Sequence, residues 1–168
     1  RRLYAWRLGE VLPHRELDVL RGIEGARMKT LYRTIAQQYG VTWKGRRYDR
    51  QNPEAADPPN QAINHAATAV EAAAAIAVTG VGALPQLGFI HEDSGSAFVL
   101  DIADLYRGDV TLPVAFGAVR ASEREPQTPL ERHVRRLAGR EFRKQKLIST
   151  MIDRIKELFD ADVRSSDP

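Results

Sequence analysis

The chain has 168 residues, of which 43% are hydrophobic and 28% are charged, as expected of one globular domain with a sizeable core. It contains no cysteine, which excludes disulfide bonds and cysteine-based zinc sites and suits a reducing cytosol. No apolar run predicts a membrane span and no signal peptide is visible, and the chain opens on Arg1 without an initiator methionine.

The net charge of +3 is unevenly distributed along the chain. Residues 1–50 carry 12 basic and 5 acidic side chains, residues 51–118 carry 1 and 8, and residues 119–156 carry 11 and 5. Each block by itself is typical of solvated helix faces. Together, however, two basic blocks favour binding of a polyanion, which the acidic block between them would repel unless a cation neutralised it.

The first long element is a predicted helix over residues 28–39, where apolar side chains recur every three or four residues. A shorter helix is predicted before it, over residues 15–21. Glu24 lies four residues before Met28 and therefore on the apolar face of the longer helix. The residues leave two interpretations open, because Glu24 is either buried beside a partner or reaches water where the helix frays at Gly25.

The middle of the chain predicts a loop followed by one long helix. Residues 41–60 are rich in Gly, Pro and Asn and predict the loop. Asp57 is a suitable cap for an alanine-rich helix over about 58–79, whose small side chains let neighbouring helices approach closely. Residues 79–88 predict a turn, and a short strand is possible at 88–91.

The C-terminal third predicts two further helices. Residues 128–131, Thr-Pro-Leu-Glu, are typical of a helix start with Thr as the cap and Pro in the first position. The helix that follows is strongly basic over 132–146, and an apolar stripe over 148–159 predicts the last helix. We therefore expect a mainly α, compact multi-helix domain over residues 1–160, and a disordered tail over 161–168.

Several acidic side chains interrupt otherwise apolar segments. Asp101 and Asp104 are three residues apart, so on the helix predicted for SAFVLDIADLYR they share a side. With His91 before that helix and Glu24 from a distant one, they suit a hard divalent cation, magnesium or manganese, able to polarise a phosphodiester. The alternatives are an ordinary loop histidine, a surface Asp101, and an Asp104 paired only with Arg107.

Four ordered stretches resemble the CRISPR adaptation integrase, in the form that accompanies subtype I-E systems. The resemblance runs over about residues 1–156 and covers the family's helical C-terminal domain, so the family's small N-terminal β domain is expected to be absent from this chain. The stretches are LRGIEGARMKTLY (20–32), QYGVTWKGRRYD (38–49), LGFIH (87–91) and FVLDIADLYR (98–107).

The resemblance implies a Mg²⁺ or Mn²⁺ site formed by Glu24, His91 and Asp104, with Asp101 as a supporting carboxylate. The subtype often has a tyrosine where this chain has Glu71, so no role of that tyrosine is carried over. The positions expected to contact DNA are Arg46, Arg107, Arg135, Arg136, Arg140 and Arg143.

The implied activity is insertion of captured DNA fragments into a CRISPR array, in which a 3′ hydroxyl attacks a phosphodiester of the repeat. The implied partners are double-stranded and branched DNA, a second copy in the full-length protein and a small ferredoxin-like companion subunit, all in the prokaryotic cytoplasm. The competing hypothesis is a helical DNA-binding or assembly fragment of the adaptation complex with no activity of its own.

Overall fold

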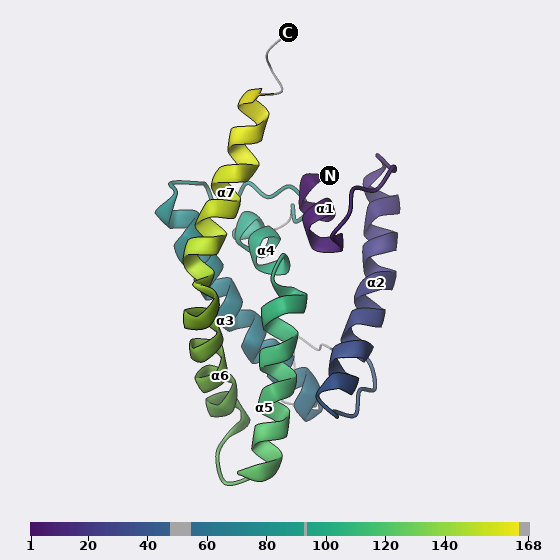
Figure 1. Ribbon diagram of the computed structural model, residues 1–168, viewed down its shortest axis with the longest axis vertical. Helices are drawn as coiled ribbons and strands as arrows, with labels where there is room; N and C mark the ends of the chain where they lie inside the picture. The colour runs from purple at the N-terminus through teal and green to yellow at the C-terminus, as the bar shows by residue number, and fades with distance from the viewer. Residues whose placement is uncertain (48–54, 93, 165–168) are drawn as a thin grey trace.

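The computed structural model describes residues 1–47, 55–92 and 94–164 of the chain, and within these ranges every regular element is helical, which confirms the mainly α class. Helices α6 and α7 follow one another along one side of the bundle, and α2 lies on the opposite side (Figure 1). The elements are α1 (Arg2–Leu8), α2 (Leu17–Gln38), α3 (Pro58–Gly80), α4 (Ala97–Asp104), the π-helix η2 (Arg107–Thr111), α5 (Leu112–Arg124), α6 (Leu130–Gln145) and α7 (Leu147–Arg164).

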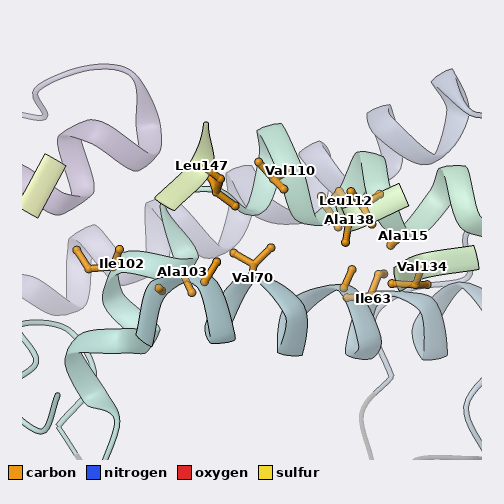
Figure 2. Packing of buried hydrophobic residues seen from close by; sticks show 14 of the residues in the cluster. Ile63, Val70, Ile102, Ala103, Val110, Leu112, Ala115, Val134, Ala138 and Leu147 are labelled. Atoms are coloured by element: carbon orange, nitrogen blue, oxygen red, sulfur yellow. The ribbon is translucent and has the colours of Figure 1, made fainter. Parts of the chain in front are cut away.

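The alanine-rich helix α3 is the centre of the core. It begins as predicted, because the Asp57 carboxylate accepts a hydrogen bond from the Asn60 backbone N–H at 3.1 Å. It packs against α4, α5, α6 and α7. Its small buried side chains permit this close approach, and Ile63 and Val70 face Leu112 and Ala115 of α5 across the core (Figure 2).

Helix α2 joins the two elements that we predicted separately for residues 15–21 and 28–39. It is continuous through Gly22 and Gly25 and ends before Gly40, which has a φ of 65°. The prediction of two helices was wrong because a glycine within a helix lowers its stability without ending it. Fraying at Gly25 is likewise excluded, so Glu24 stays on the helix.

A π-helix separates α4 from α5. Helix α4 ends at Asp104, and after a turn η2 begins at Arg107 and leads into α5, whose first turn contains Pro113. A side chain on Gly108 of η2 would meet Leu31 of α2 at 3.1 Å, so the glycine allows the two elements to lie close together. The segment 88–91 before α4 is not a strand, contrary to the possibility raised above.

The two C-terminal helices differ from the prediction at their ends. Helix α6 begins at Leu130 with Pro129 in the cap position and without a capping side chain, so the Thr128 cap was wrong. Helix α7 continues to Arg164, into the stretch 161–168 that we expected to be a disordered tail. The rest of that stretch, 165–168, lies outside the described residues.

Helix α3 also meets the criteria of length and hydropathy for a membrane span, which we had not expected of any segment. Its buried residues lie along its whole length, from Pro59 to Val78, against four other helices of the bundle. A core helix passes the same test of composition as a membrane helix, and its packing identifies α3 as a core helix.

Candidate functional site

The carboxylate of Asp101 organises the segment that precedes α4. Asp101 is completely buried, and its Oδ2 accepts hydrogen bonds from the backbone N–H groups of Phe89 at 2.5 Å and Ile90 at 3.1 Å. Its Oδ1 accepts from the His91 backbone N–H at 3.1 Å and from His91 Nδ1 at 2.7 Å. Four donors therefore satisfy one carboxylate, which corrects the alternative of Asp101 as helix surface.

Gly88 allows the backbone of residues 89–91 to turn around the Asp101 carboxylate. A Cβ atom at position 88 would collide with the His91 carbonyl oxygen and would lie 2.7 Å from the Ala97 Cβ. Only glycine leaves room for the chain to turn tightly enough for three consecutive N–H groups to converge on Asp101. The LGFIH stretch is thus a backbone cradle for one carboxylate, and its last residue is the histidine of the site.

The contact with Asp101 determines how His91 presents its ring. A carboxylate can only accept, so Nδ1 carries the proton. Nε2 then faces the rest of the site and lies 3.8 Å from Oδ2 of Asp104. Neutral His91 therefore offers a lone pair on Nε2, and a carboxylate holding the opposite ring nitrogen is the arrangement found behind metal-binding histidines.

The same contact shifts the acidity of both partners. The hydrogen bond to Asp101 raises the pKa of His91, against the effect of burial and with the help of the Asp104 charge. Burial alone would raise the pKa of Asp101, but the hydrogen bonds from His91 and the three backbone N–H groups outweigh it and lower that pKa. Asp101 is therefore held as an ion at neutral pH.

The other two predicted ligands meet through an arginine. Glu24 on α2 and Asp104 at the end of α4 are both paired with the same nitrogen, Nη2 of Arg7 on α1. The distance from Nη2 to Asp104 Oδ2 is 3.1 Å. Glu24, Asp104 and Arg7 are 14%, 10% and 7% exposed, so the buried interpretation of Glu24 is correct and its partner is Arg7.

The structure thus brings Glu24, His91, Asp101 and Asp104 into one cluster from three separate elements. In the part of the chain that the structure describes, no three acidic or histidine side chains surround a point closely enough to hold a metal ion as they stand. The donor chemistry does fit a hard divalent cation, with two carboxylates and one imidazole nitrogen. Arg7 lies between the two carboxylates.

A polar cavity of about 250 Å³ adjoins Asp104. Arg107 lines it, pairs with Oδ1 of Asp104 and donates from Nη1 to the Tyr32 hydroxyl at 3.2 Å. The alternative pairing of Asp104 with Arg107 is therefore real, and it occurs together with the cluster. Glu71 also lines the cavity, and burial and then the charge of Asp104 raise its pKa.

Arg46 reaches the same cavity from the loop after α2. Its guanidinium donates to the side-chain oxygens of Asn60 at 3.0 Å and Asn64 at 2.6 Å. Asn60 is completely buried and also accepts from the Arg47 backbone N–H and donates to the Gly45 carbonyl. One buried amide therefore holds the described part of this loop against α3 and directs Arg46 to the cavity.

The four arginines predicted on α6 do not join this cluster. Arg135 pairs with Glu131, and Arg136 lies 3.6 Å from Glu125. Arg136, Arg140 and Arg143 line a separate cavity of about 420 Å³ between α5 and α6. They form an exposed basic surface along α6, next to α3 and α5 (Figure 1).

Sequence reasoning missed Arg7 and the Tyr32 contact. Arg7 had a readable signal, because it follows the buried Leu3 and Tyr4 at helical spacing and so lies on the apolar face of α1. A charged residue on the apolar face of a helix was also the signal that identified Glu24, although Glu24 is acidic and Arg7 is basic. Tyr32 had no signal, because an aromatic residue on an apolar stripe is indistinguishable from ordinary core until its hydroxyl finds Arg107.

Comparison with known proteins supports a specific family. The model of the family described as CRISPR associated protein Cas1 matches residues 5–157. The CRISPR-associated endonuclease Cas1 of Escherichia coli (strain K12) is 37% identical over 162 residues, and that of Geobacter sulfurreducens is 36% identical over 162 residues. Both alignments cover 96% of this chain and 52% of the relative, so the chain spans about half the length of the curated relatives it matches.

Solved structures agree with the sequence comparison. A crystal structure described as a TtCas1–DNA complex matches with a TM-score of 0.84 and 39% identity, over 94% of this chain and 57% of that one. A structure of TtCas1 alone matches with a TM-score of 0.78 and 37% identity. The similarity therefore extends beyond the motifs to the backbone path of at least 90% of this chain.

Proposed function

Because the chain belongs to the CRISPR-associated Cas1 family, we propose that it is the helical domain of a divalent-metal-dependent DNA integrase and endonuclease. It inserts captured DNA fragments into a CRISPR array. One observation carries the proposal: Asp101 holds His91 so that Nε2 points to the Asp104 carboxylate, beside which Glu24 also lies. The hydrogen bonds of Asp101 would stabilise any domain, but DNA binding alone does not require an imidazole nitrogen held toward a carboxylate.

The proposed metal ligands are Glu24, His91 and Asp104, and Mg²⁺ and Mn²⁺ are the ions that suit two carboxylates and one imidazole. Asp101 acts through His91 by fixing its tautomer and orientation. When bound, the ion supplies a Lewis acid for the phosphodiester. The two carboxylates are 14% and 10% exposed, so charge interactions within this centre are stronger than they would be in water.

We propose that two arginines hold the DNA backbone next to these groups. Arg107 is held by Asp104 and Tyr32, and Arg46 by Asn60 and Asn64, and both line the cavity beside Asp104. A guanidinium fork matches the geometry of a phosphate group. We propose that these arginines orient the target phosphodiester, so that an incoming 3′ hydroxyl forms the new P–O bond while the bond to the leaving oxygen breaks.

The basic surface of α6 is proposed to bind the DNA duplex away from the reacting phosphate. Its exposed arginines match a backbone-binding role, which carries no sequence information and depends strongly on salt. The TtCas1 structure was solved as a DNA complex, which supports DNA as the partner of this chain. The further proposals, from the family resemblance, are branched DNA, dimerisation of the full-length protein, a ferredoxin-like companion subunit and a place in the prokaryotic cytoplasm.

The second candidate function is a DNA-binding or assembly fragment without activity. It is favoured by the length of the chain, which covers only 52% of its Cas1 relatives, and by the ion pairs that already neutralise Glu24 and Asp104. Both candidates predict retention on DNA at low salt, so binding alone does not distinguish them.

Nicking of branched DNA in the presence of Mn²⁺ tests the proposal. The wild-type chain should nick the DNA, EDTA should abolish the activity, and His91→Ala should lose it while retaining DNA affinity. His65→Ala is the matched control, since His65 is an exposed histidine on α3. If the wild-type chain binds branched DNA but nicks it no faster than His91→Ala, the fragment hypothesis replaces the enzyme hypothesis.

A further inference from the structure

Arg7 occupies the centre of the cluster that the proposed function assigns to a metal ion. A single nitrogen, Nη2, is paired with both Glu24 and Asp104, and Asp104 Oδ2 is shared between Arg7 at 3.1 Å and His91 Nε2 at 3.8 Å. A positive charge therefore already lies between two of the three proposed ligands, Glu24 and Asp104.

The surroundings of Arg7 indicate that its ion pairs with Glu24 and Asp104 hold its side chain in this position. Its side chain is 7% exposed, and its Nε is buried without a hydrogen-bond partner in the described structure. A buried N–H without a partner is costly, so Arg7 is incompletely satisfied in this position. Its helix α1 has only 7 residues, too few to be stable by itself.

We infer that Arg7 is a placeholder cation, which neutralises Glu24 and Asp104 in the metal-free chain and is displaced from them when a divalent ion binds. The inference rests on the proposed metal site. Two buried carboxylates repel one another unless a cation lies between them. A divalent ion and a guanidinium cannot share the same oxygens without strong repulsion, so metal binding must first break the Arg7 ion pairs.

Arg7 and the divalent ion therefore compete for the carboxylates of Glu24 and Asp104. The metal-free state is stabilised by Arg7, and the apparent metal affinity is lowered by the free energy of those ion pairs. A merely structural arginine would have the opposite effect. If Arg7 stayed in place and positioned the ligands, its removal would weaken metal binding or leave it unchanged.

The test is a calorimetric titration of the 168-residue chain with Mn²⁺, comparing wild type with Arg7→Gln. Glutamine keeps a polar side chain, is two atoms shorter than arginine and removes the charge. We expect Arg7→Gln to bind Mn²⁺ about tenfold more tightly, within the usual range of couplings between two sites. Arg27→Gln is the matched control, because Arg27 is paired with Glu10 on the surface and is 44% exposed, and its affinity should equal that of wild type.

The outcomes separate the two proposals. Binding to wild type with equal or weaker binding to Arg7→Gln would overturn the placeholder role and leave the metal site standing. Absence of Mn²⁺ binding in both proteins would overturn the metal site itself and the placeholder role with it. Arg7→Lys keeps the charge and should bind Mn²⁺ less tightly than Arg7→Gln.

A measurement on the unmodified chain guards against a variant that fails to fold. Displacement of Arg7 removes the ion pairs that connect α1 to α2 and α4. Amide hydrogen exchange in residues 2–8 should therefore accelerate when Mn²⁺ saturates the wild-type chain, while exchange in α4 slows. Unchanged or slower exchange in α1 would show that Arg7 keeps its place beside the metal and would overturn the inference.

Discussion

Replacement of Asp101 by asparagine tests the central claim about the site, because it changes one atom of a completely buried side chain. Each Asp101 oxygen accepts two hydrogen bonds, Oδ2 from Phe89 and Ile90 and Oδ1 from the backbone and ring of His91. Whichever oxygen becomes an NH₂ group will point a donor at a backbone N–H, so the cradle cannot be satisfied in either orientation of the amide.

The expected magnitude follows from counting the donors left without a partner. With NH₂ in the place of Oδ2, two part-buried backbone N–H groups lose their acceptor. With NH₂ in the place of Oδ1, one backbone N–H loses it and His91 must move its proton to Nε2. A buried unsatisfied donor costs about 1–3 kcal/mol, so we expect Asp101→Asn to lower the free energy of unfolding by about 2–5 kcal/mol.

The same substitution should weaken the metal site. With NH₂ in the place of Oδ1, the proton on Nε2 removes the lone pair that His91 presents toward Asp104. In either orientation His91 loses its supporting carboxylate, which typically costs about 10- to 100-fold in metal affinity. Urea unfolding followed by circular dichroism measures the stability, and titration with Mn²⁺ measures the affinity. Asp18→Asn is the control, since Asp18 is 95% exposed and should change neither quantity by much.

The reasoning is refuted if Asp101→Asn unfolds within about 0.5 kcal/mol of wild type, the range of ordinary surface substitutions. In that case the cradle seen around Asp101 contributes no stability. A large loss of stability with unchanged Mn²⁺ affinity would refute only the claim that Asp101 supports metal binding through His91. Asp101 would then stabilise the fold alone.

Four further predictions concern other parts of the molecule. Gly88→Ala should both destabilise the chain and lower its Mn²⁺ affinity, because the added Cβ would collide with the His91 carbonyl. Thermal unfolding measures the stability and titration with Mn²⁺ measures the affinity. Gly22→Ala is the control, since a Cβ there meets no other atom, and it should lower neither the stability nor the affinity. Asn60→Ala removes one of the two amides that hold Arg46 and should weaken DNA binding in fluorescence anisotropy. Unchanged affinity would contradict the proposed role of Asn60 in directing Arg46 to DNA. Phe116→Ala should cost about 3–5 kcal/mol in urea unfolding, since Phe116 is fully buried and packs edge-to-face on Trp43; a loss below about 1 kcal/mol would contradict the core assignment. Arg140→Gln should weaken DNA binding equally for all sequences and reduce the salt dependence by about one charge, and an unaltered salt slope would mean that Arg140 is ordinary solvated surface.

The amino-acid sequence allowed prediction of most of the helices. The apolar periodicity of 28–39, the Asp57 cap and the alanine-rich segment after it correctly indicated α2 and α3. The errors lie at helix ends, where Gly22 and Gly25 did not interrupt α2 and Thr128 did not cap α6. At these positions local preference amounts to about 1 kcal/mol, which tertiary packing readily overrides.

Prediction of the site succeeded in part and for an identifiable reason. Glu24 and Asp101 could be found because a carboxylate on an apolar face must be paired, and that rule needs only the spacing of residues. Arg7 obeys the same rule, but a long basic side chain is commonly assumed to reach water from an apolar face. The role of Tyr32 could not be predicted, because its partner Arg107 is 75 residues away.

By itself the sequence determined which side chains are out of place in an apolar environment, since that depends only on helical periodicity and on the cost of burying charge. The tertiary structure alone decided which partner each of these side chains has. Asp101 accepts from four donors, Glu24 and Asp104 share one guanidinium, and Arg46 is held by a buried amide. The physical reason is that a buried charge requires a partner without specifying where along the chain it comes from. Only the packing of α1, α2 and α4 brings Arg7 to within reach of both carboxylates.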